Sequence, residues 1–263
     1  MPVRLSSAIA AAVLLSMAGC SDDGEASRSA APSTTATPVP PVSVGRISAT
    51  IAAEAARFGD DADIDLAAEV RKILERVDGL LRFDTDVAVH VAVDADAAIP
   101  EIGVGGYTNP ASGAVLISLD PESPVGTEQS ITVWLPATLA HELNHSKRIL
   151  EGPGYGTTLG EAIVTEGLAD AFSLEAFPST PPLPWASALQ PEDLDQLATL
   201  AQSNATVMDT PDLHSEWFFG LGDIPRWAGY TVGATWVRDF LAAHEDVDVV
   251  AATLLPADEI IPG

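Results

Sequence analysis

The sequence predicts an α+β domain, mainly helical, with a small antiparallel sheet placed before its central helix. Asp86–Val93 alternates β-branched residues with small or polar ones and indicates a strand, and the apolar run Ala114–Leu119 indicates a second one. The Gly-rich stretch Gly103–Gly113 between them is typical of turns. After these runs, apolar residues recur at spacings of three and four through most of the chain, as in amphipathic helices. The strands therefore precede a largely helical second half.

Helical periodicity also appears ahead of the strands. Ile47–Phe58 is expected to be an amphipathic helix, and a second helix begins at Asp63 or Asp65, either of which can cap it. The central helix is expected over 131–150; Pro136 lies within it and is acceptable in the first turn, so the helix can begin near Leu135. Further helices are expected over 159–177, from 191 onward, over 226–243 and within 247–262, with irregular chain at 178–191 and a loop at 217–220.

The N-terminus has the anatomy of an export signal. Residues 1–19 hold a basic start, a short apolar run and small residues before Cys20, the one cysteine of the chain. The stretch Leu15–Cys20 resembles a bacterial lipobox, and an ordinary secretory signal with an incidental cysteine is the alternative. We expect a lipoprotein signal peptide at 1–19, a lipidated Cys20 with a disordered Ser/Thr/Pro-rich tether at 20–45, and a folded domain at 46–263.

The charge balance restricts the partners. With 38 acidic and 12 basic residues the formal net charge is −26, which argues against nucleic acid as a partner. A single cysteine allows no intrachain disulfide. The signal-peptide anatomy and the lipobox-like Cys20 lead us to expect an exported protein, lipid-anchored to the cell membrane and facing the extracytoplasmic side.

A His-Glu-x-x-His motif lies within the central predicted helix. His141 and His145 are four residues apart, so their imidazoles project from one helical face where a single Zn²⁺ can reach both. Glu142 follows the first histidine, where its carboxylate can activate a zinc-bound water. The motif predicts half of a catalytic zinc site.

The next predicted helix offers the third ligand. Glu166 and Asp170 share one face, so Glu166 can bind the metal while Asp170 hydrogen-bonds the far nitrogen of a ligating histidine. Glu161 is the rival ligand, but it lies about 140° round the helix from Glu166. We favour Glu166, and expect Glu161 to support the site, cap the helix or face solvent.

These residues carry a family resemblance. His-Glu-x-x-His followed by Glu-x-x-x-Asp resembles the gluzincin metalloproteases such as thermolysin. LAHELNHSKR, TLGEAIVTEGLADAF and PRWAGYTVG resemble a bacterial domain-of-unknown-function family of predicted zinc-dependent proteases, from about Asp65 to the C-terminus. The resemblance implies a zincin-like fold with zinc bound by His141, His145 and Glu166, Glu142 as general base and Asp170 in support. Lys147 departs from it, because gluzincins usually have an apolar residue there.

A donor for the oxyanion remains to be assigned. Tyr230, within PRWAGYTVG, is the first choice, and Tyr155, His214 and Arg226 are alternatives. The strand Ala114–Leu119 is a candidate edge strand for an extended peptide.

The function expected from the sequence is zinc-dependent hydrolysis of a peptide bond in a peptide or protein substrate. Two alternatives stay open: a non-catalytic surface lipoprotein that keeps a zinc site for binding, and a zinc hydrolase acting on another amide or an ester.

Overall fold

The computed structural model describes residues 39–263 as one compact unit. The predicted signal peptide, Cys20 and most of the predicted tether lie outside the described residues. No helix of the described part is long and apolar enough to cross a membrane. The sheet already includes residues 42–44, so regular structure begins before the expected domain boundary at residue 46.

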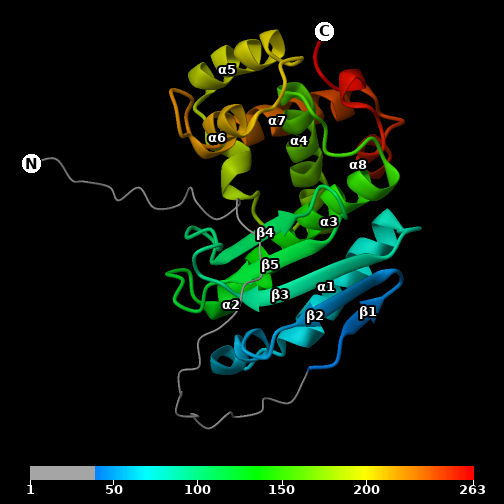
Figure 1. Cartoon of the computed structure of the whole chain (residues 1–263), viewed down its shortest axis with the longest axis vertical. Coiled ribbons are helices and arrows are strands. Elements are labelled where there is room, and N and C mark those ends of the chain that lie inside the picture. The colour runs from blue at the N-terminus through cyan, green and yellow to red at the C-terminus, as the bar shows by residue number, and fades with distance from the viewer. Residues whose placement is uncertain (1–38) are drawn as a thin grey trace, which may run out of the picture. The chain divides into compact units, whose positions relative to one another are not determined.

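A five-stranded sheet forms one side of this unit, in the order β1-β2-β3-β5-β4 (Figure 1). The strands are β1 (Val42–Val44), β2 (Ile47–Ile51), β3 (Val87–Val93), β4 (Val104–Thr108) and β5 (Val115–Leu119). The expected antiparallel sheet is wrong, because β2, β3 and β5 run parallel and only the outer strands β1 and β4 are antiparallel to their neighbours. A helix connects β2 to β3, and such a crossover permits a parallel pair.

The expected helix at Ile47–Phe58 is wrong. Residues 47–51 form β2, whose alternate residues Ile47, Ala49 and Ile51 are buried, and Ala55–Arg57 forms the short 3₁₀ helix η1. Ile47 and Ile51 are four residues apart, a spacing that fits both one face of a helix and one face of a strand. The sheet decides between them, because β2 pairs with β3 along its whole length.

The stretch Gly103–Gly113, expected to be turn, contains strand β4. β4 is an edge strand and β5 lies between β3 and β4, so the expected edge position of Ala114–Leu119 is also wrong. β4 contains Gly105 and Gly106, and because glycine has low strand propensity the sequence did not predict a strand here. A Cβ at Gly105 would lie 2.0 Å from the carbonyl oxygen of Ala97, so only glycine fits where β4 passes the backbone of residues 97–98.

The helices expected around the motif residues are confirmed, with adjusted ends. The α-helices are α1 (Leu66–Leu81), α2 (Thr127–Gln129), α3 (Leu135–Glu151), α4 (Leu159–Ala176), α5 (Pro191–Ser203), α6 (Pro211–Phe219), α7 (Ala228–Ala243) and α8 (Val249–Thr253). The shorter helical turns are η1 (Ala55–Arg57), η2 (Asp60–Ala62), η3 (Ser130–Trp134), η4 (Pro184–Ser187) and η5 (Ala257–Glu259). The expected loop at 217–220 is wrong, since all but its last residue belong to α6.

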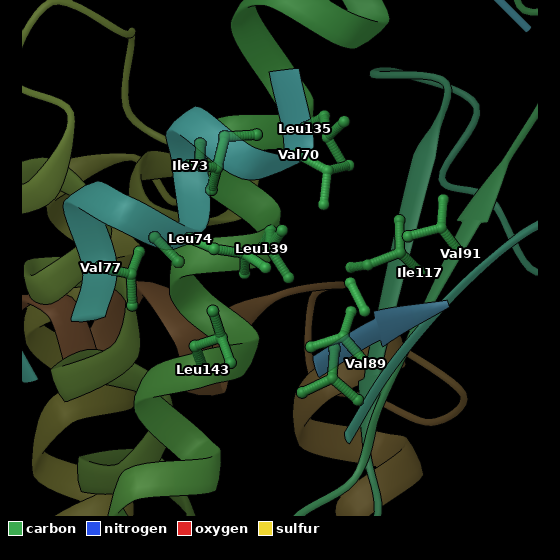
Figure 2. Packing of buried hydrophobic residues seen from close by; sticks show 14 of the residues in the cluster. Val70, Ile73, Leu74, Val77, Val89, Val91, Ile117, Leu135, Leu139 and Leu143 are labelled. Atoms are coloured by element: carbon green, nitrogen blue, oxygen red, sulfur yellow. The ribbon is translucent and has the colours of Figure 1, made fainter. Parts of the chain in front are cut away.

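One hydrophobic core joins the sheet to α1 and α3 (Figure 2). Leu135, Leu139 and Leu143 of α3 recur every four residues and are fully buried. Figure 2 shows them, together with Val70 of α1, between the helices and the sheet residues Val89, Val91 and Ile117. This packing fixes α3 against the sheet, so its opposite face is free to meet α4.

A second core lies among α4 and the later helices. α4 and α7 approach closely where Gly167 faces Gly233, since a Cβ at Gly167 would lie 2.2 Å from the carbonyl oxygen of Gly233. Glycine at both positions is therefore a packing requirement, and it brings the backbone of α7 against the helix that carries Glu166.

We expect Gly167→Ala to destabilise the protein by about 2 kcal/mol, because the added methyl forces α4 and α7 apart. Gly79→Ala is the matched control, since Gly79 is exposed in α1 and a Cβ there would meet nothing within 4 Å. The control should stabilise the protein by up to ~1 kcal/mol through helix propensity. Urea unfolding measures both, and equal effects of the two substitutions would contradict the close α4–α7 packing.

Candidate metal centre

Two helices bring the three expected ligands together. His141 and His145 lie on one face of α3, and Glu166 lies on α4, which packs against it. One donor atom from each of the three residues lies within 4.8 Å of the others. All three residues are at least 95% buried.

The contacts among the donors are short. The Nε2 atom of His141 lies 3.1 Å from Oε2 of Glu166 and 3.0 Å from Nε2 of His145. Nε2 of His145 lies 3.3 Å from the same carboxylate oxygen. Zinc bonds of 2.0–2.1 Å in a tetrahedron place donor atoms about 3.3 Å apart. The spacing and the two-nitrogen, one-oxygen donor set therefore fit zinc.

Asp170 fixes the orientation of the first histidine. Its Oδ1 atom lies 2.9 Å from Nδ1 of His141, one turn of α4 beyond Glu166. With Nδ1–H directed at this carboxylate, Nε2 faces the other two donors. This is the contact that the Glu-x-x-x-Asp spacing predicts.

The electrostatics of the cluster follow from burial and pairing. Burial lowers the pKa of His141, but the hydrogen bonds and charges of Asp170 and Glu166 outweigh it and raise that pKa well above its ordinary value. Burial raises the pKa of Glu166, yet the charge of His145 and the hydrogen bonds of both histidines bring it well below its usual range. A negative carboxylate thus faces the imidazoles at neutral pH.

Glu161, the rival ligand, is engaged elsewhere. Its Oε2 accepts hydrogen bonds from the backbone N–H groups of Thr157 and Thr158 at 2.7 and 2.9 Å. The Thr158 hydroxyl accepts from the N–H of Glu161 in return, so the pair forms a capping box at the start of α4. Glu161 therefore caps the helix on which Glu166 lies.

Glu142 lies beside the cluster and is held by the edge strand. The Thr108 hydroxyl donates to Oε2 of Glu142 at 2.6 Å and also lies 3.0 Å from its backbone oxygen. A Cβ at Gly106 would lie 2.4 Å from Oε1 of Glu142, so glycine makes room for the carboxylate. The sequence reasoning missed Thr108, because the stretch around it was expected to be turn.

Trp185 of η4 is a second residue that the sequence reasoning missed. Its indole N–H donates to Oδ1 of Asp170 at 3.0 Å, and its ring meets the ring of His141 edge-on at 5.9 Å. Trp185 lies in a Pro-rich stretch without periodicity, so no spacing signal pointed to it. Only the tertiary fold brings it to the cluster.

The four candidate oxyanion donors occupy different places, and the exposed guanidinium of Arg226 pairs with Glu101 at 2.7 Å. The Tyr155 hydroxyl donates to Oε1 of Glu166 at 2.6 Å, and His214 lies beside Tyr155 with its Nδ1 2.9 Å from Asp209. The Tyr230 hydroxyl forms no hydrogen bond within residues 39–263. Burial, followed by the charges of Glu166, Asp170 and Glu142, raises the pKa of Tyr230 well above its ordinary value. Its hydroxyl therefore stays protonated near the cluster.

Lys147, the departure from the gluzincin pattern, is directed away from the ligands. Its ammonium pairs with Glu151 and donates to the backbone oxygen of Arg82 at 3.2 Å. Glu151 in turn accepts from the backbone N–H groups of Asp84 and Thr85. The lysine thus ties α3 to the loop between α1 and β3.

We expect zinc binding to release about one proton from His141 at neutral pH, because a ligating histidine must be deprotonated. Since the pKa of His141 is raised, the apparent zinc affinity should fall as pH falls below that pKa. Calorimetric titration in buffers of different ionisation enthalpy counts the protons. His90→Gln, a change on the exposed face of β3, is the control and should not alter the count. A pH-independent affinity without proton release would contradict this charge state.

Comparisons with known proteins agree with this geometry. Residues 67–262 match the family described as Predicted Zn-dependent protease (DUF2268). A protein of Bacillus subtilis (strain 168), named Uncharacterized protein YjfC, is 27% identical over 139 residues, which cover 48% of this chain and 46% of that protein. The chain thus spans about half the length of this curated relative. No solved structure matches the chain. Because the family match covers more than half of the sequence, the chain belongs to the predicted Zn-dependent protease family.

Proposed function

We propose that this protein is a zinc-dependent peptidase of gluzincin type, with His141, His145 and Glu166 as ligands. The observation that carries the proposal is the convergence of these three buried donors beside Glu142, which a second element holds in place. The donors alone support metal binding. The adjacent carboxylate adds a proton acceptor, which hydrolysis requires.

Zinc held by these residues would polarise the scissile carbonyl and lower the pKa of a water. Glu142 takes the proton from the attacking water and returns it to the leaving amine. The Thr108 hydroxyl occupies Oε2 of Glu142, which leaves Oε1 as the oxygen for this transfer. Asp170 keeps His141 in the tautomer that presents Nε2.

Tyr230 is the proposed donor to the oxyanion. Its hydroxyl is protonated, unengaged within the described residues and close enough to feel the charges of Glu166, Asp170 and Glu142. Tyr155 is the rival, because it contacts a ligand directly, and His214 stands next to Tyr155. In the rest state the Tyr155 hydroxyl is committed to Glu166, so it would have to leave that carboxylate to serve.

The edge strand β4 is the proposed support for an extended substrate. Apart from one antiparallel bridge between Val104 and Ile99, its side opposite β5 pairs with no strand among residues 39–263. Gly106 and Thr108 of this strand border Glu142. A peptide that added to this edge would pass the general base with its backbone hydrogen-bonded. We further propose that the fold is zincin-like. The proposed substrate is a peptide or a protein.

The N-terminal sequence supports a proposal about the location of the protein. We propose that the protein is exported and anchored to the membrane through a lipid on Cys20, with the catalytic domain on the extracytoplasmic side. The lipobox-like Leu15–Cys20 and the Ser/Thr/Pro-rich residues after it support this proposal. The strongly acidic composition supports a protein without a nucleic-acid partner.

Glu142→Gln should retain zinc but lower peptide hydrolysis at least ~100-fold, because the amide cannot accept the proton. Cleavage profiling of a peptide library with the zinc-loaded protein, with and without chelator, measures the loss. Glu192→Gln, an exposed change in α5, should leave the rate unaltered.

Wild-type turnover by the Glu142→Gln variant would refute its role as general base. If zinc-loaded wild type cleaved no peptide, the protein would instead be a zinc-containing binding protein or a hydrolase of another amide or ester.

Tyr230→Phe should lower kcat about 100-fold with little change in KM, because an oxyanion donor acts mainly in the transition state. Tyr155→Phe is the matched comparison, since it also removes one tyrosine hydroxyl near Glu166. Steady-state kinetics on a single cleaved peptide separates the two tyrosines. A loss of kcat in Tyr155→Phe and none in Tyr230→Phe would transfer the role to Tyr155.

A further inference from the structure

Trp185 shares an acceptor with a metal ligand. Oδ1 of Asp170 lies 2.9 Å from Nδ1 of His141 and receives the indole N–H of Trp185 at 3.0 Å. The carboxylate therefore holds two donors on one oxygen, from α3 and from η4. Trp185 is 95% buried, so water does not compete for this contact.

The tryptophan is itself fixed by α7. The Thr231 hydroxyl donates to the backbone oxygen of Trp185 at 2.7 Å and accepts from the N–H of Ala188 at 3.1 Å. The Trp185 ring also lies 5.6 Å from the ring of Tyr230 on the same helix. The short turn η4 is thus held at its backbone, and the indole is held at its ring.

The second oxygen of Asp170 shows why this contact matters. Oδ2 is buried and has no hydrogen-bond partner within residues 39–263. A carboxylate held only by His141 would rotate about its side-chain bond and exchange its two oxygens. The indole N–H makes one oxygen the acceptor, and so fixes the plane in which the imidazole of His141 is held.

We propose that Trp185 is a positioning residue for the metal ligand His141 and acts through Asp170. The inference rests on the proposed zinc site and adds Trp185 to it, a residue of η4 rather than of α3 or α4. Partners of this kind that orient a ligating histidine typically change metal affinity 10- to 100-fold when they are removed. Trp185 should contribute to zinc affinity although it touches no zinc ligand through a hydrogen bond of its own.

The experiment measures the zinc dissociation constant of the full chain by competition with a chromophoric chelator. Trp185→Phe keeps an aromatic ring but removes the N–H donor. Trp236→Phe is the matched control, because Trp236 is 96% buried in the other hydrophobic core and lies outside the metal cluster. Asp170→Ala and the double variant Trp185→Phe/Asp170→Ala complete a cycle.

We expect Trp185→Phe to weaken zinc binding about 10-fold in the wild-type background and less than about 2-fold when Asp170 is already alanine. Trp236→Phe should leave zinc affinity unchanged. A general packing role would weaken binding equally in both backgrounds, and that result, or no loss in either, would overturn the inference.

Two checks keep the outcomes separable. If the wild-type chain bound no zinc, the proposed function would fail and the inference with it, whereas wild-type binding with an inert Trp185→Phe overturns the inference alone. If Trp185→Phe does not fold, a benzothienyl analogue of tryptophan at position 185 keeps the ring size and removes only the N–H. Equal zinc affinity with that analogue would equally overturn the inference.

Discussion

The burial of four ionisable side chains is the constraint on which this structure depends. His141, His145, Glu166 and Asp170 are each at least 95% buried, and charges removed from water cost free energy unless they are paired. Here each carboxylate meets an imidazole within 3.1 Å. The close approach of α7 to α4 at Gly167 packs α7 against the helix that carries both carboxylates.

The sequence predicts which of these four side chains share a helical face, because that depends on local geometry alone. Residues four apart share a helical face whatever surrounds the helix, so His141 with His145, and Glu166 with Asp170, needed only that α3 and α4 be helical. The buried stripe of α1 was predictable for the same reason. The choice of Glu166 over Glu161 also followed from the spacing, and the capping box now accounts for Glu161.

The features that the sequence did not predict depend on contacts between distant segments. The parallel course of β2, β3 and β5 is set by the crossover connections and leaves no periodic signal. The two glycines of β4 lower its strand propensity, and Gly106 is required because the Glu142 carboxylate of α3 approaches it closely. The apolar spacing of Ile47–Ile51 fits both a helix and a strand, and only pairing with β3 decides its conformation. Local pattern and propensity cannot contain this information.

Position and orientation are therefore specified by different parts of the chain. The helices α3 and α4 fix the Cβ positions of the proposed ligands and of Glu142. A helix does not, however, fix the rotation of a carboxylate at the end of its side chain. That rotation is set by Thr108 for Glu142 and by Trp185 for Asp170. Both residues lie in stretches that sequence reasoning treats as turn or irregular chain. A chain with both motifs but without these two elements would have its donors in place and no fixed direction for their lone pairs.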